Sequence, residues 1–406
     1  MKIKTDFLVD NFFLIIFFSY CIKLFFLNFS VSFVIVFILI IIIIKTFNFK
    51  YLFESRNLLV TLYIMSIFIS GAKAIFIPEF NINSLISAVT NTVLPIGMFM
   101  YFFNKDKVFI RINSLLFANK LFCVLGLILY IFMPKIYIKY LFNSMYGFYY
   151  ENYLLNPRLN SLLSSIIIGN ICVVSICLTI FLYRKSKISN KRLILDCFIY
   201  VICAILTFQR SAWLCLLIVL FAYLLYFSFI KRKGIKVLSL SIIFFVSIGV
   251  LIPKNLEEKL LARLETIGIA AVYERDNQWE TSINKFKENP LGSGLGTDGY
   301  ASFYNFNKNT TTDGNYFRII SEMGIFSIFF FVMLMQCLLS LTRRNLDLLL
   351  VILIYIIQLF GSNLIDTMYS GCLFWSVVGL GLNYKFSIVP KKENLNENIS
   401  ELYCSI

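Results

Sequence analysis

Histidine is absent from this chain of 406 residues. Histidine-based catalysis is therefore excluded, and a zinc site is disfavoured because imidazole is a common zinc ligand. Charge is also scarce, since Asp, Glu, Lys and Arg together make up 15% of the residues. A soluble domain normally carries about a quarter of charged residues. This scarcity of charge points away from a soluble globular fold.

Apolar residues take the place of the missing charge, with 59% hydrophobic and 17% aromatic residues. Runs such as Val31–Ile44, Leu193–Thr207 and Val237–Ile252 contain almost no charged residue. Several runs reach the roughly 20 residues that a helix needs to cross about 30 Å of hydrocarbon. The pattern predicts an all-α polytopic membrane protein, because a membrane β-barrel shows short alternating segments instead.

The apolar runs predict about twelve transmembrane helices in one domain, residues 1–390, followed by a polar tail, residues 391–406. The expected spans are 8–27, 30–45, 57–77, 84–103, 109–132, 159–183, 193–209, 211–230, 236–253, 315–341, 346–362 and 370–388. A long, partly helical loop of about residues 254–315 separates the ninth span from the tenth. A shorter tyrosine-rich loop covers about residues 133–158 and reads as an aromatic belt or as a surface for sugar rings.

The net charge of +15 does not require a nucleic-acid partner, because the basic residues form short clusters between the spans. With twelve spans, all of these clusters fall on one side together with both termini. Basic loops mark the cytoplasmic side of a membrane protein. We therefore expect both termini in the cytoplasm and the loops 133–158 and 254–315 on the outer face.

Ten cysteines are present, and nine of them lie in apolar runs. The tenth, Cys404, belongs to the polar tail, and the long loop contains none. No disulfide framework is implied by this placement.

The long loop is nearly neutral, with seven Lys or Arg and nine Asp or Glu from Lys254 to Asn315. Leucines at helical spacing predict an amphipathic interfacial helix over Asn255–Ala271, and helix continues over Val272–Lys287. Asn289-Pro290 then ends the helix, and the glycines of Gly292–Gly296 form a turn. A nucleotide-binding loop is the alternative, but no βαβ unit precedes the glycines and the P-loop lysine is missing.

Two arginines are candidates for binding phosphate. Arg210 lies in a very short outer hairpin, where the distribution of basic residues does not require it. Arginine presents a rigid fork of donors that matches phosphate oxygens, although snorkelling to lipid headgroups is the alternative. Arg275 lies in the long loop, four residues before Trp279, so a cation–π pair is its alternative explanation.

Other polar residues carry weaker signals. Arg158 closes the first outer loop, and Gly169 follows after ten intervening residues, inside the next span. Arg263 lies in the predicted interfacial helix. Arg318 has Glu322 four residues later, which is also the spacing of a simple ion pair. Asp313 precedes a span and could serve as a general base, position a sugar hydroxyl or cap the helix. Charged residues in or near the spans are functional candidates, unless their side chains snorkel to the membrane surface. The charged residues in such positions are Lys73, Lys120, Asp196 and Asp366.

Taken in order, these motifs resemble the O-antigen polymerase/O-antigen ligase superfamily. The matching segments are Gln209-Arg210-Ser211, then Arg275 to Gly296 with Arg-x-x-x-Trp and Asn-Pro-Leu-Gly-x-Gly-x-Gly, then Asp313-Gly314-Asn315-Tyr316 to Glu322-Met323-Gly324. The resemblance in hydropathy covers nearly the whole chain, and the resemblance in motifs covers about 50 residues.

The resemblance implies a glycosyltransferase at the outer face of the bacterial inner membrane that uses undecaprenyl-pyrophosphate-linked glycans. It maps Arg210 and Arg275 onto arginines that engage pyrophosphate, and we expect Asp313 to join them in catalysis. Substrate contacts are expected from Arg158, Arg263, Arg318, Trp279 and Tyr316. No cofactor or metal is expected, because the lipid-linked donor carries its own activation.

The missing histidine separates two members of that superfamily. Ligases resembling this chain typically carry a histidine at the end of the long loop, where Asp313 stands here. The sequence therefore favours an O-antigen or related surface-polysaccharide polymerase, which extends a lipid-linked chain, over a ligase, which joins the polymer to lipid A–core. A lipid-linked oligosaccharide flippase is the alternative from another class. A chain-length regulator and a flippase of the same pathway are the expected partners.

Overall fold

The computed structural model describes residues 5–25, 30–46, 48, 53–55, 57–77, 81–103, 108–132, 158–229, 270–304, 314–342 and 345–383. Within these ranges the chain is helical and contains no strand. The all-α fold predicted from the apolar runs is thereby confirmed.

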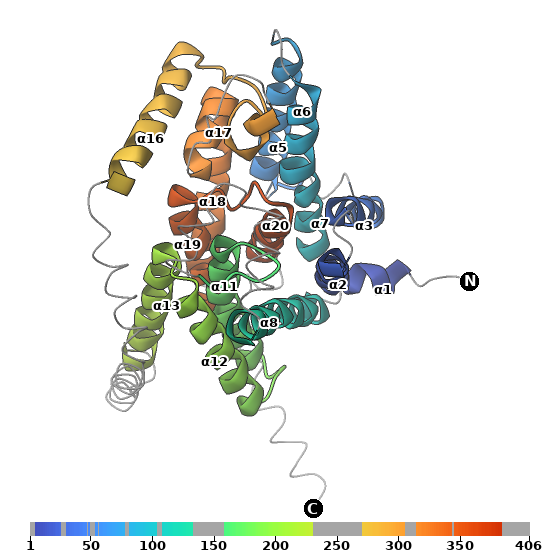
Figure 1. The fold of residues 1–406 in the computed structure, drawn as a ribbon, viewed down its shortest axis with the longest axis vertical. Helices are drawn as coiled ribbons and strands as arrows, with labels where there is room; N and C mark the ends of the chain where they lie inside the picture. The colour runs from blue at the N-terminus through green and yellow to red at the C-terminus, as the bar shows by residue number, and fades with distance from the viewer. Residues whose placement is uncertain are drawn as a thin grey trace, which may run out of the picture.

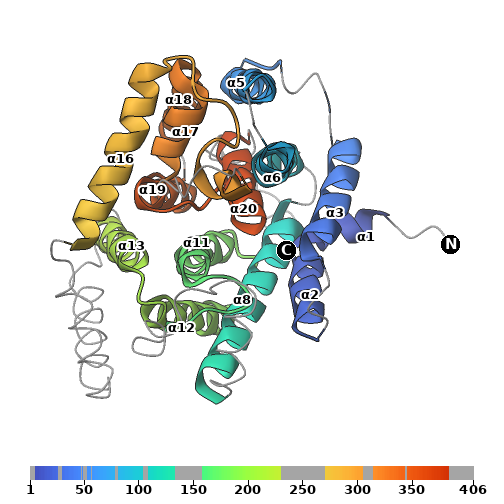
Figure 2. The same cartoon turned by 45° about the horizontal axis from the view of Figure 1, so that its top comes forward.

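The helices follow one another as an irregular bundle (Figures 1 and 2). In chain order they are α1 (Thr5–Asp10), α2 (Phe12–Phe25), α3 (Val31–Thr46), α5 (Leu58–Ile75), α6 (Ile82–Ala88), α7 (Gly97–Phe103), α8 (Val108–Phe132), α11 (Ser165–Arg184), α12 (Asn190–Leu206), α13 (Arg210–Phe229), α16 (Ala270–Glu288), α17 (Asn315–Met323), α18 (Ile328–Thr342), α19 (Leu346–Gly361) and α20 (Met368–Leu382). A π-helical and a 3-10 turn, Val89–Val93 and Leu94–Ile96, join α6 to α7.

The apolar helices fit a membrane. Five stretches are long and apolar enough to cross one: Leu58–Ile75, Ile82–Phe103, Val108–Phe132, Ser165–Arg184 and Asn315–Thr342. Shorter apolar helices accompany them in the described chain. Every predicted span coincides with a helix except 236–253, which lies outside the described residues. The chain is a multi-pass membrane protein.

Two predicted boundaries differ from the structure by several residues. The span expected over 370–388 ends at Leu382, and the other difference is at the start of α11. The span expected from residue 159 becomes helical only at Ser165. The preceding residues bond elsewhere, since the Leu159 amide donates to the Leu206 carbonyl at 2.8 Å and the Ser161 amide to the Leu163 carbonyl at 2.9 Å. The apolar side chains of this segment are buried all the same, so hydropathy alone extended the predicted helix.

Helix α11 is the central helix, and most of its residues are buried inside the protein. It lies among α8, α12, α13 and α19 (Figure 2). Its polar side chains are paired with these neighbours: Asn170 Nδ2 donates to Gln358 Oε1 at 2.7 Å, and Asn119 Nδ2 donates to Ser175 Oγ at 2.8 Å. Pairing of this kind removes the cost of placing amides and hydroxyls in an apolar interior.

One end of the bundle carries three of the predicted site residues, Trp279, Tyr316 and Arg318. We call it the α16 end and define it by the end of α5 at Ile75, the start of α6 at Ile82, the start of α17 at Asn315 and the end of α19 at Gly361. Helix α16 lies along the outside of α17 at this end (Figure 1).

Candidate functional site

Helix α16 is held against α17 by aromatic contacts. The Trp279 ring stacks on Phe317, with ring centroids 4.9 Å apart and planes inclined by 11°. The edge of Phe360 from α19 contacts Trp279 at 5.0 Å. Large aromatic rings bury much apolar surface and fix the orientation of the elements that carry them. These contacts give Trp279 a packing role in the fold.

The helix ends as the sequence predicted, at Glu288 before Asn289-Pro290. The chain then forms a turn in which Gly292, Gly294 and Gly296 have φ values of +87°, +101° and +84°. A side chain at Gly292 is also excluded by space, because its Cβ would lie 2.4 Å from the Glu322 carbonyl oxygen. We call residues 289–299 the glycine loop. Its glycines form the predicted turn, and this turn packs on other backbone.

The glycine loop fills the space between α17 and the α5–α6 pair. The amides of Ser293 and Gly294 donate to the carbonyls of Ser321 and Glu322 at 2.8 and 3.0 Å. The Leu295 amide donates to the Ser70 carbonyl of α5 at 3.1 Å. Lys73, near the end of α5, donates to the Gly292 carbonyl. Backbone hydrogen bonds thus hold the loop on both sides.

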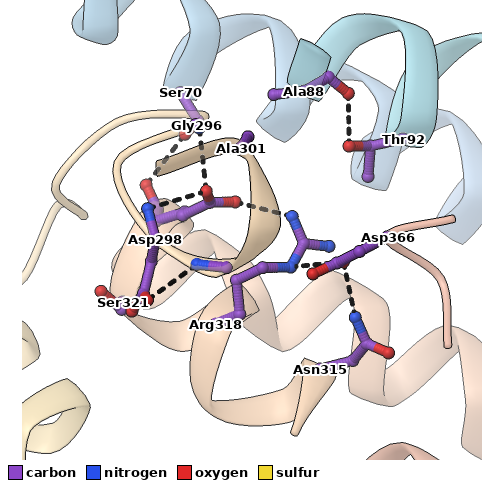
Figure 3. Close-up of polar contacts among 12 residues, drawn as sticks. Ser70, Ala88, Thr92, Gly296, Asp298, Ala301, Asn315, Arg318, Ser321 and Asp366 are labelled. Atoms are coloured by element: carbon purple, nitrogen blue, oxygen red, sulfur yellow. Dashed lines mark hydrogen bonds and ion pairs between the residues drawn. The ribbon is translucent and has the colours of Figure 1, made fainter. Parts of the chain in front are cut away.

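Arg318 and Asp366 lie next to the glycine loop (Figure 3), and with Glu322 they form a group of three buried charges. Arg318 Nη1 is 2.9 Å from Glu322 Oε2, and Arg318 Nε is 2.8 Å from Asp366 Oδ1. The three side chains are only 4%, 1% and 5% exposed. The predicted ion pair between Arg318 and Glu322 is confirmed, and Asp366 is part of it. The guanidinium of Arg318 therefore forms its ion pairs with carboxylates inside the protein.

Glu322 links this ion pair to the glycine loop. Its Oε1 accepts hydrogen bonds from the Gly296 and Asp298 amides at 2.8 and 3.3 Å. Asp298 is buried and reaches α16, with Oδ2 accepting from Ser282 Oγ at 3.4 Å and lying 3.6 Å from Lys285 Nζ. Asp298 is not among the site residues predicted from the sequence. An isolated acid after a glycine turn carries no sequence pattern, so only tertiary contacts reveal it.

The start of α17 is held from the other side. Asn315 Nδ2 donates to Asp366 Oδ1 at 2.8 Å, and Asn315 Oδ1 accepts from the Ile365 amide at 3.0 Å. The Gly314 amide donates to Asn363 Oδ1 at 3.1 Å. The chain therefore enters α17 at a fixed point, between the glycine loop and the α19–α20 connection.

A second group of contacts surrounds Arg210, which begins α13. Gln209 Nε2 donates to Ser165 Oγ at 2.9 Å, and a side chain on Gly169 would place its Cβ 2.9 Å from the Ala212 Cβ. Gly169 therefore permits close approach of α11 and α13. Because Leu159 also bonds to Leu206, the segment after Arg158 is joined to the hairpin that carries Arg210. Arg158 and Arg210 are both half-buried.

The last turns of α19 connect the two groups. Tyr316 OH donates to the Ile356 carbonyl at 2.8 Å, Gln358 pairs with Asn170 of α11, and Phe360 contacts Trp279. Asn170 directly follows Gly169, which packs against α13. Helix α19 therefore contacts both groups and determines how far α16 and α17 lie from α11 and α13. The Tyr316 hydroxyl is used in this packing.

Of the remaining predicted residues, some lie in the part of the chain that the structure describes and others do not. Arg275 lies in the first half of α16, and the N-terminal end of this helix points toward α13 (Figures 1 and 2). Arg263, Asp313, residues 255–269 of the predicted interfacial helix and residues 133–157 lie outside the described residues. Among the residues that are described, no group of three or more Cys, Asp or Glu could hold a metal ion.

The sequence model of a known family matches this part of the chain. Residues 195–332 match the family described as O-antigen ligase. No curated protein matches the chain. The family match covers Arg210, the long loop and α17, and it confirms the resemblance to the O-antigen polymerase/O-antigen ligase superfamily. Members of this family are glycosyltransferase-like enzymes that act on O-antigen.

Proposed function

We propose that this protein is a polymerase of O-antigen or a related surface polysaccharide. It transfers the glycan chain from one undecaprenyl pyrophosphate to a lipid-linked repeat unit at the outer face of the bacterial inner membrane. The absence of histidine from all 406 residues carries the choice of polymerase over ligase. Ligases resembling this chain keep a histidine where Asp313 stands, so an imidazole-dependent transfer is not open to it.

The transfer exchanges one glycosidic bond for another. A hydroxyl oxygen of the acceptor sugar attacks the anomeric carbon of the donor chain, and the bond from that carbon to the pyrophosphate oxygen breaks. Undecaprenyl pyrophosphate leaves with the electron pair, and the hydroxyl proton passes to a carboxylate. The acids proposed for this step are Asp313, Glu274 and Glu280; Glu280 is exposed on α16.

Arginines lower the barrier to departure of the pyrophosphate. Its negative charge increases as the bond breaks, and preorganised guanidinium groups stabilise that charge at the plane of the lipid headgroups. Arg210 and Arg275 are proposed for this role, with Arg158 and Arg263 binding the same substrate. Arg318 is proposed to support the fold instead, because its buried ion pairs leave it away from the surface.

The location follows from the same chemistry. Lipid-linked repeat units reach the outer face of the inner membrane, so the α16 end must face outward and both termini must lie in the cytoplasm. A flippase that delivers the repeat units and a regulator that sets chain length are the proposed partners. The protein needs no nucleotide, metal or nucleic acid for this reaction.

Deletion of the gene tests the proposal. A strain without the polymerase makes lipopolysaccharide capped with a single repeat unit, visible as one band above the core on a gel. Accumulation of lipid-linked polymer in the deletion strain would instead identify a ligase. Complete loss of surface O-antigen, including the single unit, would identify a flippase. Re-expression of the chain from a plasmid is the control and restores the ladder.

A further inference from the structure

Asp298 ties the glycine loop to α16 through one face of the helix. Its Oδ2 accepts from Ser282 Oγ at 3.4 Å and lies 3.6 Å from Lys285 Nζ. Ser282 and Lys285 are three residues apart, so they lie on the same side of α16. Oδ1 accepts the Gly299 amide at 2.8 Å and fixes the carboxylate in its own turn.

The loop side of this contact is rigid. The Asp298 and Gly296 amides donate to Glu322 Oε1, and Arg318 holds the other oxygen of Glu322 at 2.9 Å. All these groups are buried in contact with α17. A displacement of α16 relative to α17 therefore has to break the contacts of Asp298 with Ser282 and Lys285.

The second attachment of α16 is Trp279, three residues before Ser282. Its ring stacks on Phe317 at 4.9 Å. If the Asp298 contacts are lost, this stacking remains and becomes the point about which α16 can tilt. Arg275 lies one turn before Trp279, about 6 Å along the helix axis at 1.5 Å per residue.

We propose that Asp298, with Ser282 and Lys285, is a positioning device for Arg275 that itself touches no substrate. The proposal rests on the proposed role of Arg275 at the pyrophosphate. A tilt of about 10° about Trp279 moves the backbone at Arg275 by roughly 1 Å, given the helix rise. A displacement of about 1 Å of a group in a catalytic arrangement costs on the order of 10²-fold in rate. A mostly buried contact in the second half of α16 thereby sets the backbone position of Arg275 in the first half.

The test compares variants of the full-length protein in detergent or vesicles. The substrate is the lipid-linked repeat unit extracted from the deletion strain, and turnover is expressed per mole of folded protein. We expect Asp298→Asn to lower turnover about 10- to 100-fold with a smaller change in KM. Lys285→Ala and Ser282→Ala change turnover in the same direction. Lys287→Ala and Thr281→Ala, exposed on the same helix, are the matched controls and leave it unchanged.

A double-mutant cycle separates positioning from a merely structural role. Arg275→Lys keeps the charge and part of the activity, so further losses remain measurable. If Asp298 acts through Arg275, Asp298→Asn lowers turnover by less than about threefold in the Arg275→Lys background. A full additional loss in that background, or normal turnover of the single variants, overturns the proposal. If Asp298→Asn does not fold, the same cycle with Lys285→Ala decides.

The Arg275→Ala variant distinguishes failure of the proposed role of Arg275 at the pyrophosphate from failure of the positioning proposal. Normal turnover of this variant contradicts the proposed role of Arg275 at the pyrophosphate. Loss of turnover in Arg275→Ala together with normal turnover in Asp298→Asn, Ser282→Ala and Lys285→Ala contradicts only the positioning.

Discussion

Arg210 and Arg275 come from different parts of the chain, the first at the start of α13 and the second in α16. A guanidinium offers a planar fork of donors, whereas the lysine ammonium is a point charge. The chemistry proposed for the two residues depends on this fork, because two oxygens of a pyrophosphate can be bound at once.

Alanine at either position is expected to abolish polymer. Loss of one preorganised donor to the developing charge costs roughly 10²-fold or more in rate. Lysine is expected to restore part of the ladder, since it returns the charge without the fork. The measurement is the lipopolysaccharide ladder of complemented deletion strains, with the protein in the membrane quantified by immunoblot. Full ladders from both alanine variants would contradict the pyrophosphate role.

Arg318 is expected to behave differently from these two arginines. Arg318→Ala leaves the buried Glu322 and Asp366 without their counter-charge, and breaking a buried ion pair in this way costs about 3–5 kcal/mol. The prediction is therefore loss of folded protein, measured as a lowered unfolding temperature in detergent. An unchanged unfolding temperature together with lost activity would contradict this prediction and support a contact between Arg318 and the substrate.

The sequence could identify Arg318 and Glu322 as a pair, because their spacing of four residues is local. It could not identify Asp366 or Asp298 as their partners, since these acids come from distant parts of the chain and belong to no repeating pattern. The same limit explains Trp279. Its spacing from Arg275 predicted a local contact as one alternative, but its stacking partner Phe317 lies on another helix.

At the level of elements, the glycine loop decides how closely α17 approaches the α5–α6 pair. Helix spans and the end of α16 were predictable, because hydropathy and Asn289-Pro290 are written into the sequence. The path of the glycine loop was not, because backbone hydrogen bonds to Ser70, Ser321 and Glu322 determine it. The late start of α11 has the same origin in a backbone contact between distant segments.

Gly292→Ala tests the packing of this loop. The substitution strains a backbone with φ of +87° and places Cβ 2.4 Å from a carbonyl oxygen. The left-handed conformation alone costs about 1–2 kcal/mol in a residue with a side chain. We expect a clear fall in unfolding temperature. Gly71→Ala is the matched control, since its Cβ would make only ordinary contacts, with Leu295 Cδ2 at 3.8 Å and Leu85 Cδ1 at 4.0 Å. Equal stability of the two variants would contradict the packing.

On the scale of the whole molecule, the charges of the connections set the orientation. The α11–α12 connection carries Lys185 and Lys187 and is expected in the cytoplasm, whereas the α5–α6 connection is expected outside. Alkaline phosphatase fused after Ile77 should be active, and the same enzyme fused after Lys187 should be inactive. Fusions of green fluorescent protein at the same positions are the control and give the reverse result. An inactive phosphatase at Ile77 would place the α16 end in the cytoplasm, away from the donor.

The break at Gly324, with φ of +59°, divides the long apolar stretch Asn315–Thr342 into α17 and α18. An unbroken helix of this length would span about 42 Å, well beyond the roughly 30 Å of hydrocarbon. A straight rod would have to tilt as a whole whenever membrane thickness changed. With the break, α17 and α18 can take different inclinations, and α17 stays fixed to the glycine loop and to Asp366. We therefore expect the reaction to tolerate lipids of different acyl length, a form of mechanical insulation from the bilayer.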